Sequence, residues 1–478
     1  MMQSRSRRAF LAQLTRVAAT YPLLRTSPLR AEMRQPPRGA TQKDAQHLSI
    51  SVDWDRVISR IPANMLGLSY EASQLSAPDF FSPANRDLIH LFRRLSPQGV
   101  LRLGGNLSEY TTWSPDLFRA PAASFHSIGA DPSSGAEIAR APISRQSIRN
   151  LRAFLDQTQW KAIYGINLAQ MSPENAAKEA QFAARTLGPR LIAFQIGNEP
   201  DHYVMNHLRK PGYRFEDYFS EWKKVHDAIL DVVPTARFAG PDIAQDTSWI
   251  RDFAQAAPKS VILLTGHHYA VGPPTDPSVN IGKLLAPDKV LTQDMAAIEA
   301  ICRERNLPYV MAETNSCYNA GKAGVSDVFA ASLWAVDYFL QLAASGQQGV
   351  YFHGGANGRY TPIAGGSGKP FAPRPIYHGL QMAGTLQNAE IVAVHRETEL
   401  SEISTYALRS PHRLAVINKG ATHAVIHLAQ EQNPPRHVQR LQAPSPESQR
   451  DITLITQPIS AGAPLSVPAY SAAVFTLQ

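Results

Sequence analysis

Two glutamates at the ends of apolar runs are the residues of this sequence best suited to catalysis. Glu199 follows Asn198 in "FQIGNEPDHY", and Glu313 stands in "YVMAETNS". Two carboxylates that face each other in different surroundings can take opposite roles, because one is kept as a proton donor while the other stays ionised. Hydrolysis of a glycosidic bond requires such a pair. One acid protonates the departing oxygen, and the other carboxylate attacks the anomeric carbon or activates a water molecule.

Other apolar runs also end in polar side chains. Each of these residues alone is explained by the preference of turns for Asn, Asp and Glu, but their recurrence indicates a polar site. Asn198 is placed to hydrogen-bond the sugar hydroxyl beside the reacting carbon, and Tyr269 or His267 could donate to an ionised Glu313. The polar residues at these ends are Glu71, Asn106, Asn198, Glu199, His267, His268, Tyr269, Glu313, Asn315 and His353.

This chemistry needs a scaffold that brings the strand ends together. Eight short apolar runs alternate with helix-like segments, a pattern typical of a parallel sheet that is buried on both faces. Eight such units predict an α/β fold, the (β/α)8 TIM barrel, whose active site lies at the C-terminal ends of the strands. The runs span residues 64–73, 99–106, 160–168, 191–200, 237–243, 262–269, 309–316 and 349–355.

The pattern changes after about residue 385 to short alternating runs without long helices. Such runs predict a C-terminal antiparallel β-sandwich, to which the alternating run at 47–54 could add a strand. Residues 430–439, "QEQNPPRHVQ", are expected to form a surface loop. The expected segments are a leader at 1–40, an N-terminal strand at 41–60, a catalytic barrel at 61–378 and a β-sandwich at 379–478.

The positive charge of the chain is concentrated at its start. The formal net charge is +8, but residues 1–40 hold eight Arg and one acid, Glu32, which leaves about +1 for the rest. A nearly neutral body does not favour nucleic acid as a partner. Arg7 and Arg8 precede a modestly apolar stretch and resemble a twin-arginine export signal, so we expect a periplasmic or secreted protein.

No metal or organic cofactor is predicted, and no segment is apolar enough over about twenty residues to insert into a membrane. His267 and His268 are adjacent, and adjacent residues of a strand point to opposite faces, so only one of them can face the site. Cys302 and Cys317 are the only cysteines and are expected to be free thiols. The sequence predicts no particular oligomeric state.

Three longer stretches make the comparison with known glycosidases specific. "NEP" after the fourth strand and a glutamate ending the seventh resemble the clan of retaining barrel glycosidases. "LSPQGVLRLGG", "AETNSCY" and "SDVFAASLWAVDYF" are similar to segments of glycoside hydrolase family 79, the β-glucuronidase and heparanase family. The resemblance spans roughly residues 64–380 and extends to the order of barrel and sandwich.

The resemblance implies roles for individual residues. Glu199 would be the acid/base and Glu313 the nucleophile, with Tyr269 beside it. Asn198 would bind the 2-hydroxyl, and Glu71 would bind hydroxyls near the non-reducing side. The strand-end pattern, rather than the resemblance, adds Asn106 as a substrate-binding residue and His267 and His353 as supporting residues.

The resemblance also implies a clamp for the carboxylate of glucuronic acid. Tyr318 and Tyr360 would hold it, together with backbone N–H groups just after Tyr318. Heparanase has consecutive glycines at that point, whereas this chain has Asn319 and Ala320, which resist unusual backbone dihedrals. A neutral tyrosine clamp suits the reaction because it adds no cation beside a developing oxocarbenium ion.

The sequence therefore predicts a retaining exo-β-glucuronidase that acts by double displacement on a carbohydrate containing glucuronic acid. One alternative is an endo-acting, heparanase-like hydrolase of sulfated polysaccharide, which should line an open cleft with Lys and Arg. A second alternative is a non-catalytic carbohydrate-binding barrel, against which the retention of Glu199 and Glu313 argues.

Overall fold

Eight parallel strands form a closed barrel in the computed structural model, which describes residues 45–117, 137–354, 358–366, 368–429, 434–460 and 462–478. Each strand lies within or across one of the eight apolar runs, so the predicted TIM barrel is confirmed. In order around the barrel the strands are β10 (Tyr309–Cys317), β11 (Gly349–Gly354), β2 (Leu66–Glu71), β3 (Val100–Gly104), β6 (Lys161–Ile166), β7 (Leu191–Ile196), β8 (Phe238–Ile243) and β9 (Val261–Val271).

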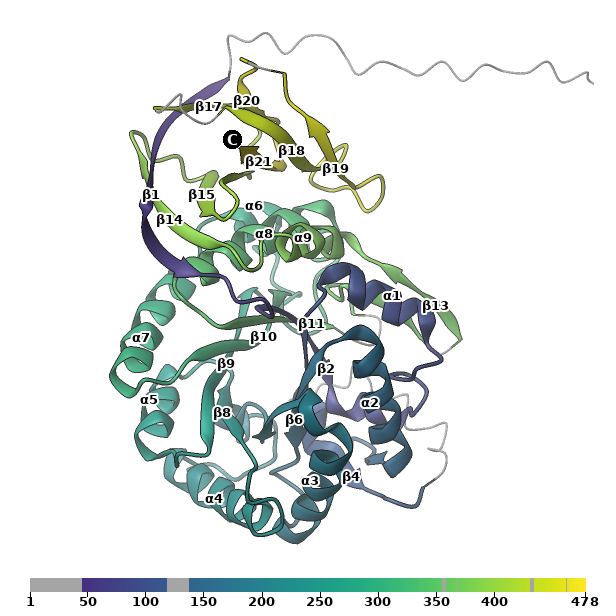
Figure 1. Cartoon of the computed structure of the whole chain (residues 1–478). Coiled ribbons are helices and arrows are strands. Elements are labelled where there is room, and N and C mark those ends of the chain that lie inside the picture. Colours follow the sequence, from purple (N-terminus) through teal and green to yellow (C-terminus); the bar gives the residue numbers. More distant parts are fainter. Residues whose placement is uncertain (1–44, 118–136, 355–357, 367, 430–433, 461) are drawn as a thin grey trace, which may run out of the picture. The chain divides into compact units, whose positions relative to one another are not determined.

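Helices surround this barrel (Figure 1). Several begin at side chains that the sequence supplies for capping. Ser144, Ser172 and Asp288 each accept a hydrogen bond from the backbone N–H three residues later, which satisfies a free donor of the first helical turn. The helices are α1 (Arg86–Leu95), α2 (Arg145–Thr158), α3 (Pro173–Leu187), α4 (Phe215–Val232), α5 (Thr247–Ala256), α6 (Ile281–Leu285), α7 (Lys289–Arg305), α8 (Phe329–Ala344) and α9 (Pro375–Gly384).

The interior of the barrel is filled by side chains, as it is in other TIM barrels. A separate buried cluster made mostly of small aliphatic residues occupies it, and polar side chains replace aliphatic ones toward the C-terminal strand ends. The cluster consists of Val100, Ile163, Ala193, Ala239, Val310, Ala312 and Tyr351.

The C-terminal region forms one curled, mostly antiparallel sheet of nine strands, in keeping with the expected all-β region. The N-terminal strand β1 (Gln46–Arg60) lies within this sheet, antiparallel to one neighbour and parallel to the other. A second apolar core fills the curl. In sheet order the strands are β19 (Thr453–Pro458), β18 (Pro435–Gln442), β21 (Ser471–Leu477), β16 (Arg413–Asn418), β15 (Ile403–Arg409), β14 (Glu390–Arg396), β1, β17 (Ala424–Leu428) and β20 (Leu465–Val467).

The prediction of a surface loop at 430–439 was wrong for its second half. There β18 begins at Pro435 and pairs with both β19 and β21. Only Val438 and Leu441 of this strand are buried. These two residues are three positions apart, so the strand lacks the apolar–polar alternation by which a strand is recognised in a sequence. Its other residues are mostly polar.

Short elements complete the description. α9 crosses the boundary that we placed between residues 378 and 379, and Ser332 of α8 donates a hydrogen bond to the carbonyl oxygen of Pro375 at its start. Two small sheets pair β4 (Thr111–Trp113) with β5 (Ala141–Ile143) and β12 (Ile363–Gly366) with β13 (Lys369–Pro373).

Three further expectations concern the rest of the chain. Cys302 and Cys317 are unbridged, as expected. Within the described residues, no helix is both long and apolar enough to cross a membrane. The proposed export signal at 1–40 lies outside the described residues and stays a prediction.

Candidate active site

The C-terminal strand ends surround a cavity of ≈ 880 Å³. Residues from β2, β9, β10 and β11 reach it, together with residues that follow β3 and β7. Nearly all the residues singled out in the sequence line this cavity, and Asn198 lies against its wall, hydrogen-bonded to Asn106. The predicted residues in the lining are Glu71, Asn106, Glu199, His267, Tyr269, Glu313, Tyr318, Asn319, His353 and Tyr360.

Glu199 stands three residues after the end of β7, in an unusual backbone conformation. Its φ of 50° and ψ of 54° place it in the left-handed region, which non-glycine residues seldom adopt. Its N–H donates to the carbonyl oxygen of Asp242 at 2.8 Å, and Pro200 follows. Strained residues of this kind cluster at functional sites, where the surrounding structure holds them. The backbone thus directs the buried carboxylate of Glu199 into the cavity.

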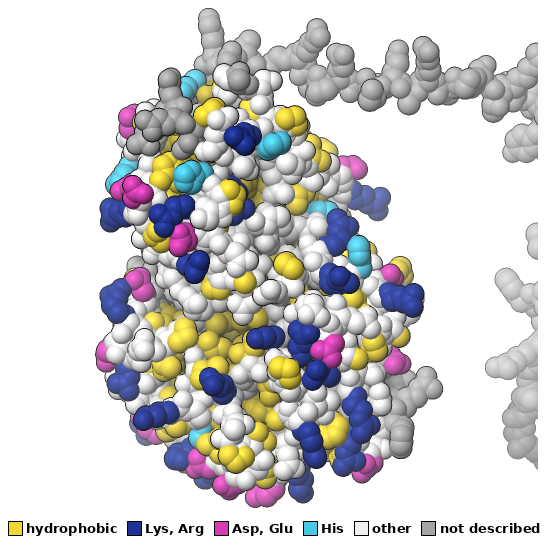
Figure 2. Space-filling model, viewed as in Figure 1, with side chains coloured by type: hydrophobic (Ala, Val, Ile, Leu, Met, Phe, Trp, Pro, Cys, Tyr) yellow, Lys and Arg dark blue, Asp and Glu magenta, His cyan; other side chains and the backbone are white. Residues whose placement is uncertain are grey.

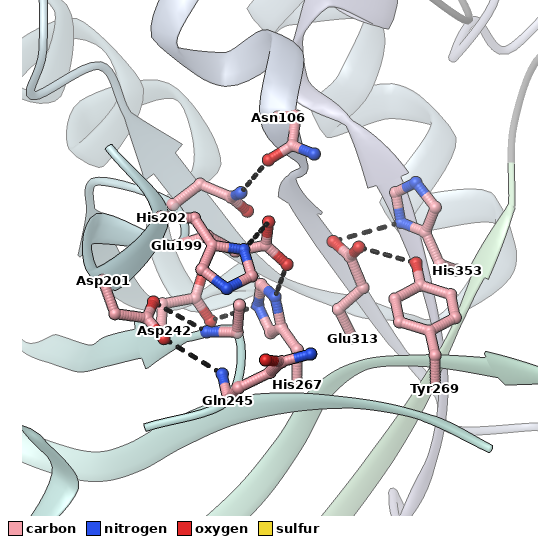
Figure 3. Close-up of polar contacts among 12 residues, drawn as sticks. Asn106, Glu199, Asp201, His202, Asp242, Gln245, His267, Tyr269, Glu313 and His353 are labelled. Atoms are coloured by element: carbon pink, nitrogen blue, oxygen red, sulfur yellow. Dashed lines mark hydrogen bonds and ion pairs between the residues drawn. The ribbon is translucent and has the colours of Figure 1, made fainter. Parts of the chain in front are cut away.

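His267 links Glu199 to a second carboxylate (Figure 3). Its Nδ1 lies 2.9 Å from Oε1 of Glu199, and its Nε2 lies 2.9 Å from Oδ1 of Asp242. Burial alone would lower the pKa of His267, but the charges of Asp242 and Glu313 outweigh it and raise the pKa to about 10. At neutral pH His267 is therefore an imidazolium that hydrogen-bonds Oε1 of Glu199 and forms an ion pair with Asp242. Oε2 of Glu199 lies 4.0 Å from Nδ1 of His202.

Glu313 is held as an anion by donors on several strands. Tyr269 donates to its Oε1 at 2.7 Å, Arg102 donates to its Oε2 at 2.5 Å, and Nδ1 of His353 lies 3.3 Å from Oε2. Burial would raise the pKa of Glu313, but the charges of His353, His267 and Arg102 hold it well below its ordinary range. An ionised carboxylate fixed by several donors can act as a nucleophile.

Glu199 and Glu313 are close together. One carboxylate oxygen of each, and one ring nitrogen of His267, all lie within 4.8 Å of one another. Carboxyl groups of retaining glycosidases are about 5 to 5.5 Å apart, whereas those of inverting enzymes are about 6.5 to 9.5 Å apart to make room for a water molecule. The distance between the carboxylate oxygens of Glu199 and Glu313 is therefore in keeping with the shorter separation of retaining enzymes.

Arg102 is the main residue that our sequence analysis missed. It is fully buried on β3 and donates to Glu313, Asn198, Gln195 and Ser69, besides forming an ion pair with Asp242. A signal was present, because a single arginine inside the apolar run "GVLRLGG" is costly unless it is paired.

Two buried acids complete the network and were also missed. Asp242 on β8 stays ionised because Arg102 and His267 outweigh its burial and lower its pKa. Glu109 accepts hydrogen bonds from the backbone N–H of Asn198 at 2.8 Å and from the hydroxyl of Tyr203 at 2.7 Å. Burial nevertheless raises the pKa of Glu109. From the sequence alone, each of these two acids could equally be an ordinary polar residue of a turn.

The segment after β10 turns sharply and leaves backbone donors free. Asn319, Ala320 and Gly321 have φ values of 52°, 65° and 86°, so the non-glycine residues do adopt the left-handed conformation that we had doubted. No hydrogen bond within the described structure uses the N–H of Asn319 or Ala320. The ring of Tyr318 packs directly on Gly272, where a Cβ would lie 2.1 Å from it. Within the described residues, the turn therefore holds two N–H groups without a partner, in residues that line the cavity.

Tyrosines form the adjoining wall. The ring of Tyr269 lies 6.0 Å from that of Tyr360 and 6.5 Å from that of Tyr318. Asn315 donates to the carbonyl oxygens of His353 and Tyr360 at 2.8 and 3.1 Å, which ties the end of β11 to β10. Three tyrosine rings thus gather at this wall, and the hydroxyl of one of them, Tyr269, donates to Glu313.

The remaining predicted residues are held by hydrogen bonds to neighbouring segments. Asn198 donates through its Nδ2 to Asn106 at 3.2 Å and accepts from Arg102 at 2.6 Å. Glu71 accepts from the N–H of Leu107 at 2.9 Å and lies 3.7 Å from Nε2 of His353. These side chains can offer both donors and acceptors to a polyhydroxylated ligand.

The adjacent histidines separate as expected from strand geometry. His267 faces Glu199, whereas His268 pairs with Asp288 of the α7 cap at 2.8 Å, although both line the cavity. Glu199, His267 and Glu313 are close enough to chelate a cation. Arg102 and the imidazolium of His267 already compensate their negative charges, so this donor set does not favour a metal ion.

A family model matches more than half of this chain. The model of glycosyl hydrolase family 79, N-terminal domain, matches residues 82–340. A β-glucuronidase of Aspergillus niger is 26% identical over 73% of this chain and 68% of its own length. One of Neurospora crassa is 24% identical over 71% of this chain and 66% of its own length. This chain spans about two thirds of either relative.

Similar architecture also occurs among solved structures. The 4-O-α-L-rhamnosyl-β-D-glucuronidase from Fusarium oxysporum 12S superposes with a TM-score of 0.72 and 17% identity, over 90% of this chain and all of that one. At this identity the likeness supports the fold, a barrel joined to a β-sheet domain.

Proposed function

The chain belongs to glycosyl hydrolase family 79, and from that premise we propose that it is a retaining exo-β-glucuronidase. It releases terminal β-linked glucuronic acid from glycans or glycoconjugates. The observation that carries this proposal is the pair Glu199 and Glu313, whose carboxylate oxygens come within 4.8 Å of each other in a cavity. The β-glucuronidase relatives support the choice of sugar.

The reaction has two displacements. In the first, the carboxylate of Glu313 attacks the anomeric carbon, the glycosidic C–O bond breaks, and Glu199 gives its proton to the leaving oxygen. In the second, Glu199 takes a proton from water, whose oxygen attacks the anomeric carbon and releases Glu313. The charges of His353, His267 and Arg102 favour the ionised form of Glu313 that the first step needs.

The glucuronate carboxylate is proposed to bind where Tyr318, Tyr360 and the free N–H groups of Asn319 and Ala320 meet. Aligned backbone N–H groups form concave anion sites. A hydroxyl and amide clamp also keeps formal positive charge away from a sugar that becomes cationic in the transition state. Left-handed non-glycine residues are costly, and a binding role explains why the chain retains them here.

The roles of the two glutamates are tested by separate amide variants. E313Q should lose nearly all hydrolysis of aryl β-glucuronides, because no nucleophile remains. E199Q should lose about 10²–10⁴-fold on a poor leaving group and far less on a dinitrophenyl glucuronide, which needs no protonation. E299Q, at an exposed position of α7, is the matched control. Unchanged turnover in E199Q and E313Q would eliminate this mechanism and favour a non-catalytic barrel.

The carboxylate clamp is tested by sugar preference. Y318F and Y360F should lower kcat/KM for a glucuronide by about tenfold or more, because a hydrogen bond to a charged group is lost, and should leave the corresponding glucoside little affected. Y470F, in the turn just before β21, is the control. A parallel loss on both sugars would contradict the clamp.

The exo mode is proposed from the charge of the chain. An enzyme that binds inside a sulfated polysaccharide needs rows of cations, whereas the chain beyond residue 40 is nearly neutral. On the face shown in Figure 2, Lys and Arg side chains are spread over both the barrel and the sheet. Digestion of a defined oligosaccharide should release only free glucuronic acid from the end. Larger internal fragments would support the endo-acting alternative.

A further inference from the structure

The cavity is larger than one sugar needs. Its volume of ≈ 880 Å³ lies near the upper end of the roughly 300–1,000 Å³ of pockets that enclose drug-sized ligands. A single glucuronic acid is much smaller than such a ligand, and the residues around Glu313 and Tyr318 account for its binding. The remaining space is therefore available to the group attached to the sugar.

This remaining space begins beside Glu199. Since the proton donor lies next to the glycosidic oxygen, the leaving group lies on the Glu199 side of the sugar. There the segment after β7 and the segment after β8 bound the cavity, which continues along α5 and α7. We call this part the leaving-group lobe; its lining includes His202, Met205, Gln245, Ile250, Val290 and Met295.

The carboxylate of Asp201 fixes the two segments to each other. Asp201 accepts hydrogen bonds from the backbone N–H of Ala244 at 2.9 Å, Gln245 at 3.0 Å and Asp246 at 3.2 Å. Figure 3 shows Asp201 facing Gln245 beside His202. Three consecutive N–H groups on one carboxylate make a rigid clip, so the walls of the lobe are set before a ligand arrives.

The lobe is rich in apolar side chains. Ile250 of α5 and Met295 of α7 line its depth. At its rim Met205 is 52% exposed and Val290 is 61% exposed, and both are among the few large apolar side chains that the described residues expose. Exposed apolar area that is gathered at a cavity marks a binding surface more often than isolated exposed residues do.

The charges around the lobe are negative. Asp288 and Asp294 line the cavity, and among its described lining residues there is no Lys or Arg. Burial raises the pKa of Asp294, so a negative charge is already unfavourable at this position. A sulfate or carboxylate on the leaving group would meet these carboxylates without a lining Lys or Arg to offset them.

We propose that the leaving-group lobe binds an uncharged, largely apolar leaving group, such as an aryl or polycyclic alcohol, and discriminates against anionic ones. This inference rests on the proposed function, because it names what the β-glucuronide carries. It assigns the enzyme to small apolar glucuronides rather than to sulfated polysaccharides.

The test compares two substrates that differ by one anionic sulfonate group. Wild-type enzyme should hydrolyse 2-naphthyl β-D-glucuronide with a kcat/KM about tenfold or more above that of its 6-sulfonate. V290K and M205K place a cation on opposite walls of the lobe, and each should lower this ratio several-fold. V232K introduces the same charge at an exposed position of α4 that does not line the cavity, and should keep the wild-type ratio.

Phenyl β-D-glucuronide distinguishes failure of the lobe proposal from failure of the proposed function. If wild-type enzyme cleaves it but treats the naphthyl pair equally, or if V290K and M205K both leave the ratio unchanged, the lobe proposal is wrong while the proposed function stands. If no glucuronide is cleaved, the proposed function fails and this inference fails with it.

Discussion

Glu313 illustrates how single residues set the chemistry of this site. It is buried, which would favour the neutral acid, yet His353, His267 and Arg102 keep its pKa low. Arg102 and His353 contact Oε2 of this carboxylate, and the hydroxyl of Tyr269 donates to Oε1. A nucleophile that is ionised over a wide pH range follows from this arrangement.

Replacing His353 tests that electrostatic account. H353N removes one of the charges that lower the pKa of Glu313, so that pKa rises and the acidic limb of the pH profile of kcat/KM moves to higher pH. Activity near about pH 4 should fall several-fold more than activity at neutral pH. H395N, at an exposed position in the nine-stranded sheet, is the control. An unchanged acidic limb in H353N would show that this histidine does not act on Glu313.

Residue types alone predicted part of this site. Polar strand ends could be recognised because they follow apolar runs, and all of those named lie at or against the cavity. Arg102, Asp242 and Glu109 could not be placed in the same way, because their function depends on contacts between strands that are distant in the sequence. Only the closed barrel brings Arg102 against both Glu313 and Asp242.

The connecting segments after β7 and β8 act as paired elements. Glu199 and Asp242 both have left-handed backbones and are joined by a hydrogen bond from N–H to carbonyl oxygen. Two residues further on, Asp201 clips the next segment through three N–H groups. The wall beside the acid/base is thus built from backbone contacts that are fixed in advance.

Breaking the clip should affect large leaving groups first. D201N replaces a carboxylate oxygen by an NH₂ group that cannot accept a hydrogen bond, which should cost about 1–3 kcal/mol of unfolding free energy. Because Asp201 is a positioning residue, kcat/KM for 2-naphthyl β-glucuronide should fall more than that for methyl β-glucuronide, mainly through KM. D231N, on the exposed face of α4, is the control. Equal losses on both substrates would assign Asp201 a purely structural role.

At the level of elements the barrel was the easier prediction. Its strands are buried on both faces and read as continuous apolar runs. The sheet was harder, since strands with one solvated face show weak patterns. β18, with Val438 and Leu441 as its only buried residues, was taken for a loop, and β20 is only three residues long.

For the whole molecule, the buried charges make stability depend on pH. His267 has a folded pKa of about 10, raised from an unfolded value of 6.5. A raised pKa stabilises the fold fully below the unfolded value, and this contribution is lost as pH rises toward the folded value. The unfolding free energy should therefore decline between about pH 6.5 and 10 by up to about 1.4 kcal/mol for each pH unit.

Denaturant unfolding across this range checks the sign. H267N should show a shallower decline than wild type between about pH 7 and pH 9.5, whatever its stability at a single pH. H395N should keep the wild-type slope. An identical slope in H267N would mean that His267 is not an imidazolium in the folded protein.

The central claim is that this molecule cleaves β-glucuronides through a covalent bond to Glu313. Incubation with 2-deoxy-2-fluoro-β-D-glucuronyl fluoride, followed by mass spectrometry of the intact protein and its peptides, tests this claim most directly. The account predicts a single fluoroglucuronyl adduct on Glu313, absent from E313Q. An adduct on another residue, or turnover of aryl glucuronides without any adduct, would contradict it.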